Sequence, residues 1–310
     1  MSSHPELRDL PGTLPRRLAI TGASGFLGQA LAGALHSAGS TVHRVRRAAH
    51  VSAPDIAWDP ASGRIDGARF EGVDAVVHLA GESLARRWTP KRKRLIRESR
   101  VAGTQLLVRA LTELRDSPKV LLSGSAIGFY GQRGDEELDE ASEPGDDFLA
   151  EVTEEWERAA VPARAAGIRV VLLRTGIVLN PGGGALRKML LPFKLGLGGR
   201  IGSGRQWMSW IALSDWVRAV VFLLGHAAID GPVNLVAPNP VRNEEFVKTL
   251  GHVLHRPTVI PLPSMAVSLL FGEMGRATLL ASQRVHPRRL TAAGFVFESP
   301  TLQAALQAET

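Results

Sequence analysis

The stretch LAITGASGFLG at residues 18–28 decides the fold of this 310-residue chain. Its first four residues are typical of a buried strand, and glycines follow at positions 22, 25 and 28. Apolar residues then recur at three- and four-residue intervals up to Ala38, as they do in a helix. Glycines let a turn approach a ligand closely, and the helix that follows offers free N–H groups and a favourable dipole to a phosphate. The stretch therefore predicts a strand, a turn and a helix that bind the pyrophosphate of a dinucleotide.

The rest of the segment up to Arg174 alternates short apolar runs with helical periodicity, which is the pattern of a parallel sheet wrapped by helices. We therefore expect the α/β class, with a doubly wound parallel Rossmann sheet. The expected strands are 18–21, 41–45, 55–58, 75–79, 120–123 and 168–173, and the expected helices are 27–38, 91–114 and 148–166.

The pattern changes after Thr175, where Gly- and Pro-rich segments separate shorter periodic pieces. Helices are expected at 214–224, 243–254 and 265–271, and a strand at 233–236 continues the sheet. We assign residues 1–15 to a disordered lead-in, 16–180 to the dinucleotide-binding domain and 181–310 to a small C-terminal substrate lobe.

Composition narrows the function classes. The chain has no cysteine, which excludes disulfides, thiolate metal sites and cysteine nucleophiles, and we expect no metal site. Its formal charge of +7 is spread along the chain, so a polyanionic small molecule fits better than nucleic acid. The apolar stretches are too short to span a bilayer and the first 15 residues are polar, so we expect a cytoplasmic protein without a membrane partner.

The end of the second strand predicts which cofactor binds. An acidic residue at this point would bind a ribose 2′-hydroxyl, whereas arginine accepts a 2′-phosphate. The segment here contains Arg46 and Arg47, and no Asp or Glu occurs from Ser40 to Pro54. The sequence therefore favours NADP(H), with both arginines as the clamp. The carboxyl end of the fourth strand, at Leu79, Ala80, Gly81 and Glu82, contains small residues that leave room for the adenosine and ribose.

With these motifs, the chain resembles the extended short-chain dehydrogenase/reductases, and more closely their atypical branch of epimerase family proteins, which carries a C-terminal domain of unknown function. The matching segments are 20–28, 78–82, 99–104, 123–131, 147–157, 174–179, 204–215 and 289–295. The resemblance implies a sheet of about seven parallel strands, NADP(H) across their carboxyl ends, and a cofactor set of Gly22, Ser24, Gly25, Phe26 and Leu27 with Ser123 and Arg174. It implies no particular reaction.

The catalytic pair of that superfamily is missing. Members usually combine a Ser or Thr with a Tyr and with a Lys four residues later, which lowers the pKa of the phenol. Ser125 matches the Ser position, but the single tyrosine, Tyr130, is followed four residues later by Gly134. By elimination, Ser125 and Tyr130 are the candidate catalytic residues, with Glu82, Asp147 and Glu151 as the other proton-transfer groups.

A second cluster lies in the C-terminal half, in the stretch GSGRQWMSW at residues 202–210. Glycines beside a cation, an amide and indoles are typical of a polar-rimmed aromatic binding surface. We therefore expect Arg205, Gln206, Trp207 and Trp210 to contact a small polar substrate, which fits a nucleotide-linked molecule.

Three functions remain open on the sequence alone. The first is an NADP-dependent oxidoreductase or epimerase that uses non-standard residues. The second is a non-catalytic NADPH-binding regulator or redox sensor, which the missing Tyr-Lys pair favours. A nucleic-acid or membrane-associated role rests only on the net charge. We expect a monomer or a homodimer, for which the helix at 91–114 is the natural surface in this superfamily.

Overall fold

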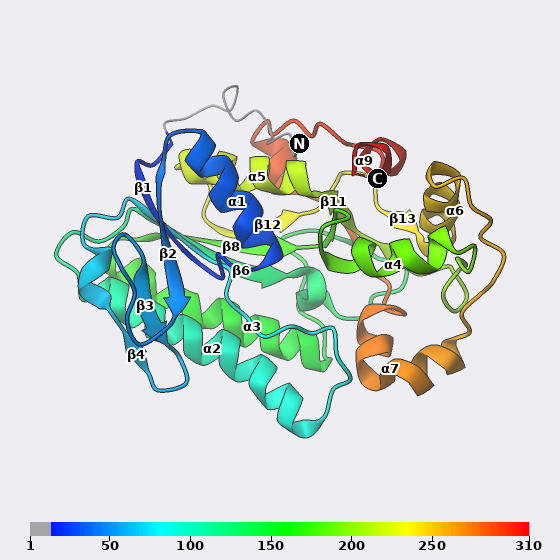
Figure 1. Cartoon of the computed structure of the whole chain (residues 1–310), viewed down its shortest axis with the longest axis horizontal. Coiled ribbons are helices and arrows are strands. Elements are labelled where there is room, and N and C mark those ends of the chain that lie inside the picture. The colour runs from blue at the N-terminus through cyan, green and yellow to red at the C-terminus, as the bar shows by residue number, and fades with distance from the viewer. Residues whose placement is uncertain (1–13, 310) are drawn as a thin grey trace.

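A parallel sheet forms the centre of the molecule in the computed structural model, which describes residues 14–309 (Figure 1). Within that range the central sheet has eight strands in the order β12-β8-β6-β5-β1-β2-β3-β4. All neighbours are parallel except β3 and β4. The strands are β1 (Arg17–Thr21), β2 (Thr41–Arg47), β3 (Ile56–Asp59), β4 (Arg64–Ile65), β5 (Ala75–His78), β6 (Val120–Ala126), β8 (Arg169–Thr175) and β12 (Gly231–Leu235).

The expected sheet is confirmed, since seven of these strands within residues 14–309 are parallel and coincide with the seven apolar runs. The additional strand, β4, is a two-residue antiparallel edge that follows the turn after Asp59. It is too short to produce an alternating pattern, which is why the sequence does not predict it. The order reverses between β1 and β5, so the carboxyl ends of these two strands form the crevice in which open α/β sheets bind ligands.

Helices cover both faces of the sheet (Figure 1). One face packs against α1 (Phe26–Ser37) and α5 (Leu213–Gly225), and its core contains Leu31, Leu122 and Phe222. The other face packs against α2 (Pro90–Thr112) and α3 (Phe148–Ala160), with Leu107 and Leu121 among its buried residues. The short helices η1 (Gly67–Phe70), η2 (Ile127–Tyr130) and η3 (Val161–Ala166) complete this half.

The C-terminal half contributes to both the central sheet and a lateral lobe. β12 extends the sheet beside β8, and its Val233 shares one core with Leu18 of β1. The lobe has in addition a core of its own, which includes Leu186 and Phe246. The lobe comprises β9 (Ile177–Leu179), α4 (Gly184–Lys194), β10 (Trp207–Met208), β11 (Trp210–Ala212), β13 (Val241–Arg242), α6 (Asn243–Val253), α7 (Ser264–Thr278), α8 (Arg288–Ala292) and α9 (Leu302–Glu309), and β14 (Arg284–Val285) pairs with β7 (Glu137–Leu138).

Residues 1–13 of the expected lead-in lie outside the described residues. Within residues 14–309, no helix combines the length and the apolar character that crossing a bilayer requires.

Candidate functional site

The glycine turn between β1 and α1 is shaped so that only glycine fits at two of its positions. Gly22 has φ +68°, and a Cβ there would lie 2.8 Å from the carbonyl carbon of Leu79. A Cβ on Gly28 would lie 2.2 Å from the carbonyl oxygen of Gly22. These contacts bring the turn against the segment that follows β5, at the reversal point of the sheet.

The N-terminus of α1 is open to an anion. Its N-cap is Gly25, which provides no side-chain cap, and the first turn contains no acidic residue. The first backbone N–H groups therefore have no partner within the helix and carry the positive end of its dipole. Ser24, Phe26 and Leu27 surround this end, and Phe26 packs so closely on Gly183, before α4, that a Cβ there would lie 2.3 Å from its ring. These residues fit the pyrophosphate of a dinucleotide.

A buried histidine fixes the facing loop. His78 has no exposed surface, with Nδ1 2.7 Å from Thr21 Oγ1 and Nε2 2.9 Å from Thr104 Oγ1. The Thr104 hydroxyl donates to the carbonyl of Arg100, so its oxygen accepts from Nε2–H and the Thr21 hydroxyl donates to Nδ1. Thr21 Oγ1 also accepts from the N–H groups of Leu79 and Ala80. The neutral imidazole thus positions the loop, and burial lowers its pKa to about 4.

Gly81 and Glu82 continue this loop and are held from α2. Ser99 Oγ accepts from the Glu82 N–H, and Arg100 donates to the Glu82 carbonyl. The Glu82 carboxylate forms an ion pair of 2.8 Å with Arg92. The charge of Glu82 is therefore paired with Arg92, which suits a residue that shapes the loop.

The two arginines at the end of β2 differ in their surroundings. Arg46 forms an ion pair of 3.3 Å with Asp55, although its side chain is 61% exposed. Arg47 is exposed and makes no ion pair with any residue from 14 to 309. A cavity of about 730 Å³ begins directly after it, and Trp58 and Asp59 at the end of β3 are part of its lining. Trp58 itself is buried in the core, where its ring packs edge-on against His78.

Ser125 lies in a buried charged cluster between β6, β8 and α3. Its hydroxyl donates to Glu157 Oε1 at 2.6 Å. Arg174 binds the same carboxylate with two N–H groups, at 2.8 and 2.9 Å. Glu157 is therefore a third member that the sequence analysis missed. Its spacing from Leu149, Val152 and Trp156 puts it on the buried face of α3, and a carboxylate on an apolar face was the available signal.

Tyr130 joins this cluster through Arg174. Its hydroxyl donates to Asn234 Oδ1 at 2.7 Å and accepts from Arg174 at 3.1 Å. The side chain has no exposed surface, and burial raises the pKa of the phenol to about 12. Both hydrogen-bonding roles of this hydroxyl are filled within the protein, so in this arrangement it offers no group to a substrate.

Arg174 and Ser123 also lie inside the molecule. The guanidinium of Arg174 stacks 3.5 Å from the centre of the Phe129 ring and is satisfied by Glu157 and Tyr130, so it belongs to the buried cluster and not to a cofactor surface. Ser123 has no exposed surface, and its hydroxyl has no hydrogen-bond partner within residues 14–309.

The four residues that we expect to contact substrate differ in their burial. Trp210 is fully buried, and its indole N–H donates to the Asn239 carbonyl, so the structure places it in the core of the lobe. Gln206 is also buried, and its side-chain amide donates to the backbone carbonyls of Ile201 and Leu279. Arg205 is exposed.

Trp207 remains at the surface of this loop. It is stacked between Arg242 and Arg284, and its indole N–H donates to Asp135. Through Ser282, the same loop is tied to Gly134, in the segment that follows β6 and η2. Trp207 therefore lies beyond the carboxyl end of β6, on the side where the glycine turn lies.

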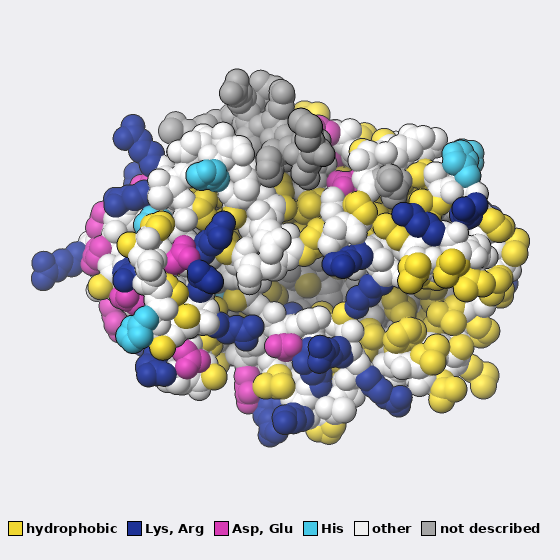
Figure 2. All heavy atoms as spheres, in the orientation of Figure 1, with side chains coloured by type: hydrophobic (Ala, Val, Ile, Leu, Met, Phe, Trp, Pro, Cys, Tyr) yellow, Lys and Arg dark blue, Asp and Glu magenta, His cyan; other side chains and the backbone are white. Residues whose placement is uncertain are grey.

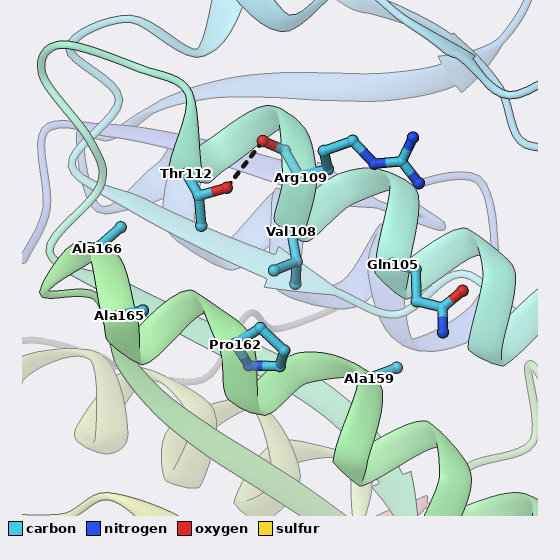
Figure 3. Close-up of a pocket in the computed structure, with 8 residues that line it drawn as sticks. All are labelled: Gln105, Val108, Arg109, Thr112, Ala159, Pro162, Ala165 and Ala166. Atoms are coloured by element: carbon cyan, nitrogen blue, oxygen red, sulfur yellow. Dashed lines mark hydrogen bonds between the residues drawn. The ribbon is translucent and has the colours of Figure 1, made fainter.

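A further cavity of about 540 Å³ opens between α2 and η3 (Figure 3). Its lining is mostly small or aliphatic, and none of it belongs to the glycine turn, to residues 79–82 or to the Glu157 cluster. This cavity lies beside α2, the helix that we expect to form a homodimer surface. Its lining contains no carboxylate or histidine that could act as a general acid or base.

Comparison with known proteins identifies the relatives of this arrangement. Residues 18–236 match the NAD dependent epimerase/dehydratase family, and residues 262–309 match a domain of unknown function, DUF1731. An epimerase family protein of Mycobacterium bovis is 44% identical over 93% of this chain and 96% of its own. The crystal structure of the human epimerase family protein SDR39U1 (isoform 2) with NADPH is 38% identical, covers 94% of this chain and 98% of its own, and has a TM-score of 0.85.

A second solved relative extends this set. A nucleoside-diphosphate sugar epimerase from Corynebacterium glutamicum is 37% identical, with a TM-score of 0.79 over 95% of this chain and 58% of its own. The glycine turn and all but the first residue of the central sheet fall within the first match, and the second match covers the end of the C-terminal lobe, from residue 262 onward, while β13 and α6 lie between the two. The chain belongs to the NAD dependent epimerase/dehydratase family, in the group of epimerase family proteins that carry a C-terminal DUF1731 domain.

Proposed function

We propose that the chain is an NADP(H)-dependent oxidoreductase or epimerase that acts on a small polar, nucleotide-linked substrate. The observation that carries the proposal is the uncapped N-terminus of α1 beside the basic end of β2, because together they suit a pyrophosphate and a 2′-phosphate. The 38% identical human relative was solved with NADPH, which supports the same cofactor here.

The cofactor would lie across the carboxyl ends of β1 and β5. Ser24, Phe26 and Leu27 would donate backbone N–H groups to the pyrophosphate, since the Gly25 N–H already donates to the Gly22 carbonyl, and residues 79–82 would border the adenosine and ribose. Arg47 would bind the 2′-phosphate directly, because it makes no competing ion pair within residues 14–309, while Arg46 shares its charge with Asp55.

The bound nicotinamide accepts or supplies a hydride, and a protein group must then handle the proton of the substrate oxygen. Ser125, whose side chain is only 5% exposed, is the first group of a path that can do so. Its hydroxyl already donates to Glu157, so it can receive a proton from a substrate hydroxyl while its own proton passes to the Glu157 carboxylate. Tyr130 would act indirectly, by holding Arg174 against Glu157.

The C-terminal lobe would supply the substrate contacts. Arg242 and Arg284 stack on the Trp207 ring, so this residue would border the substrate with a cationic rim, and the exposed Arg205 two residues away would offer a further cation to a phosphate. The 37% identical relative named as a nucleoside-diphosphate sugar epimerase supports a nucleotide-linked sugar.

The test is turnover with purified chain and NADP(H) or NADP⁺ on a panel of nucleoside diphosphate sugars, followed by absorbance at 340 nm and by chromatography of the sugars. We expect one sugar to be oxidised, reduced or epimerised. Ser125→Ala should lower kcat by about 100-fold, within the usual range for a proton-transfer group, and should leave the Kd for NADPH within about twofold. Ser37→Ala, at an exposed position in the last turn of α1 and away from the glycine turn, is the matched control. Unchanged kcat in Ser125→Ala would remove the proposed proton path.

A second function is favoured by one specific observation. The only phenol is enclosed, with both of its hydrogen-bonding roles filled, and residues 148–152 provide no Tyr-Lys pair. A chain that binds NADPH tightly but turns over no sugar nucleotide would be a non-catalytic NADPH-binding regulator or redox sensor. Tight binding without turnover on the panel is the result that would favour this function over the first.

A further inference from the structure

A group of large apolar side chains is exposed on one side of the C-terminal lobe, and the cofactor site does not use them. They lie on α4, on the loop before α7 and on α7 itself. The most exposed are Leu191, Leu195, Val259, Met265, Leu269 and Leu270, between 60% and 84% exposed. We call this surface the apolar patch.

The patch is one continuous surface, because backbone contacts join its segments. The N–H of Ile260 donates to the carbonyl of Gly198, and the N–H of Leu262 donates to the carbonyl of Arg200. Arg256 also donates to the carbonyl of Lys194, at the end of α4. Hydrophobic side chains accordingly gather at the lower right of Figure 2, over the region of α7 in Figure 1. Scattered surface leucines need no explanation, but a contiguous apolar surface marks a binding surface.

The first part of α7 is apolar on both of its faces. Val267 is fully buried, whereas Met265 and Leu269, one turn apart, are 84% and 77% exposed. A helix that only covers a core places polar residues on its outer face. The outer face of α7 is therefore suited to an apolar environment.

The charged side chains within the two segments that carry most of the patch are all of one sign. Residues 187–200 and 255–271 contain no Asp or Glu. Five basic side chains in these two segments are exposed, at Arg187, Lys188, Lys194, Arg200 and Arg256. The first acidic residue beyond them, Glu273, is paired with Lys93 at 2.8 Å.

An apolar surface with a cationic surround is complementary to an anionic lipid surface, where apolar side chains enter the interface and Lys and Arg meet phosphate headgroups. A second copy of the chain seated on the same patch would place these like charges opposite each other, which opposes association. We propose that the apolar patch docks onto the surface of an anionic phospholipid bilayer. This peripheral contact departs from the expectation of no membrane partner, which considered spanning segments and net charge alone.

The test uses the full chain and vesicles of phosphatidylcholine, either pure or with one third phosphatidylglycerol, in a co-sedimentation assay. We expect binding to the mixed vesicles that is at least about tenfold tighter than binding to the pure ones. Leu269→Ser/Leu270→Ser should weaken binding to mixed vesicles at least about tenfold, because two inserted side chains are lost. Val161→Ser/Val296→Ser, at exposed apolar positions outside the patch, is the matched control and should bind as the unaltered chain does.

The Kd for NADPH and the circular dichroism spectrum of each variant check that the fold is retained. Two results would overturn the proposal. One is the absence of co-sedimentation, or equal binding to both kinds of vesicle. The other is a concentration-dependent dimer in light scattering that Leu269→Ser/Leu270→Ser makes monomeric, which would assign the patch to contact between copies.

Discussion

Single side chains at this site are fixed by hydrogen bonds whose direction can be worked out. Thr104 donates to the carbonyl of Arg100, which forces His78 to carry its proton on Nε2 and to accept at Nδ1 from Thr21. If Nδ1 of His78 were also protonated, its N–H would face the hydroxyl oxygen of Thr21. That oxygen already accepts from the backbone N–H groups of Leu79 and Ala80. Protonation of one histidine therefore opposes the loop conformation that the cofactor needs.

This arrangement gives the first prediction. The pKa of His78 falls from 6.5 to about 4 in the folded state. A lowered folded pKa adds stability that is fully present above pH 6.5 and is lost as the pH falls toward 4, here about 3 kcal/mol. In an NMR titration, the His78 ring signal, identified by its loss in His78→Gln, should stay unshifted from pH 8 to pH 5. Titration of that signal near pH 6.5 would contradict this account.

The second prediction concerns Tyr130→Phe, which removes a hydroxyl and almost no volume. The change leaves Asn234 Oδ1 and one N–H of Arg174 without their partner in a buried place. The free energy of unfolding should fall by about 1–3 kcal/mol in urea denaturation. The Kd for NADPH should change by less than about twofold. Unaltered stability together with abolished turnover would instead make the phenol a catalytic group.

At the scale of the element, α3 shows how one residue begins a helix that carries functional side chains. Asp147 accepts from the N–H groups of Leu149 and Ala150, both at 2.9 Å. The third prediction is that Asp147→Ala lowers the free energy of unfolding by about 1 kcal/mol, the usual loss for an N-cap. Asp146→Ala, at the exposed neighbour, should change it by less than about 0.5 kcal/mol. Equal effects of the two changes, measured by urea denaturation, would rule out the capping role.

Elements were predictable from the sequence where apolar periodicity was long or bounded by glycine. All seven parallel strands and α1, α2, α3, α5 and α6 follow from such patterns. α4 was missed because glycines precede it and Pro192 lies inside it, so its sequence reads as loop. Two strand pairs, β7–β14 and β10–β13, have only two residues in each strand. They depend on tertiary contacts that no local sequence pattern encodes.

At the scale of the whole molecule, the sequence predicted the cofactor turn better than the catalytic groups. Glycine spacing reports directly on backbone shape, so the turn could be located without knowing its neighbours. The partners of Ser125 come from α3 and β8, and Tyr130 meets Asn234 across 104 residues, so their burial depends on the assembled sheet. For the same reason Trp207 and Trp210 look alike in sequence, yet one is stacked between arginines near the surface and the other lies in the core.

The central claim is that this fold binds NADP(H) through the basic end of β2, and calorimetry of NADPH and NADH tests it most directly. A guanidinium gains about 1.5–3 kcal/mol from a charge-assisted contact with a 2′-phosphate, so NADPH should bind at least about tenfold more tightly than NADH. Arg46→Ala/Arg47→Ala should remove the preference, whereas Arg44→Ala, an exposed arginine on the same strand, should retain it. Equal dissociation constants for NADPH and NADH in the unaltered chain would contradict the account.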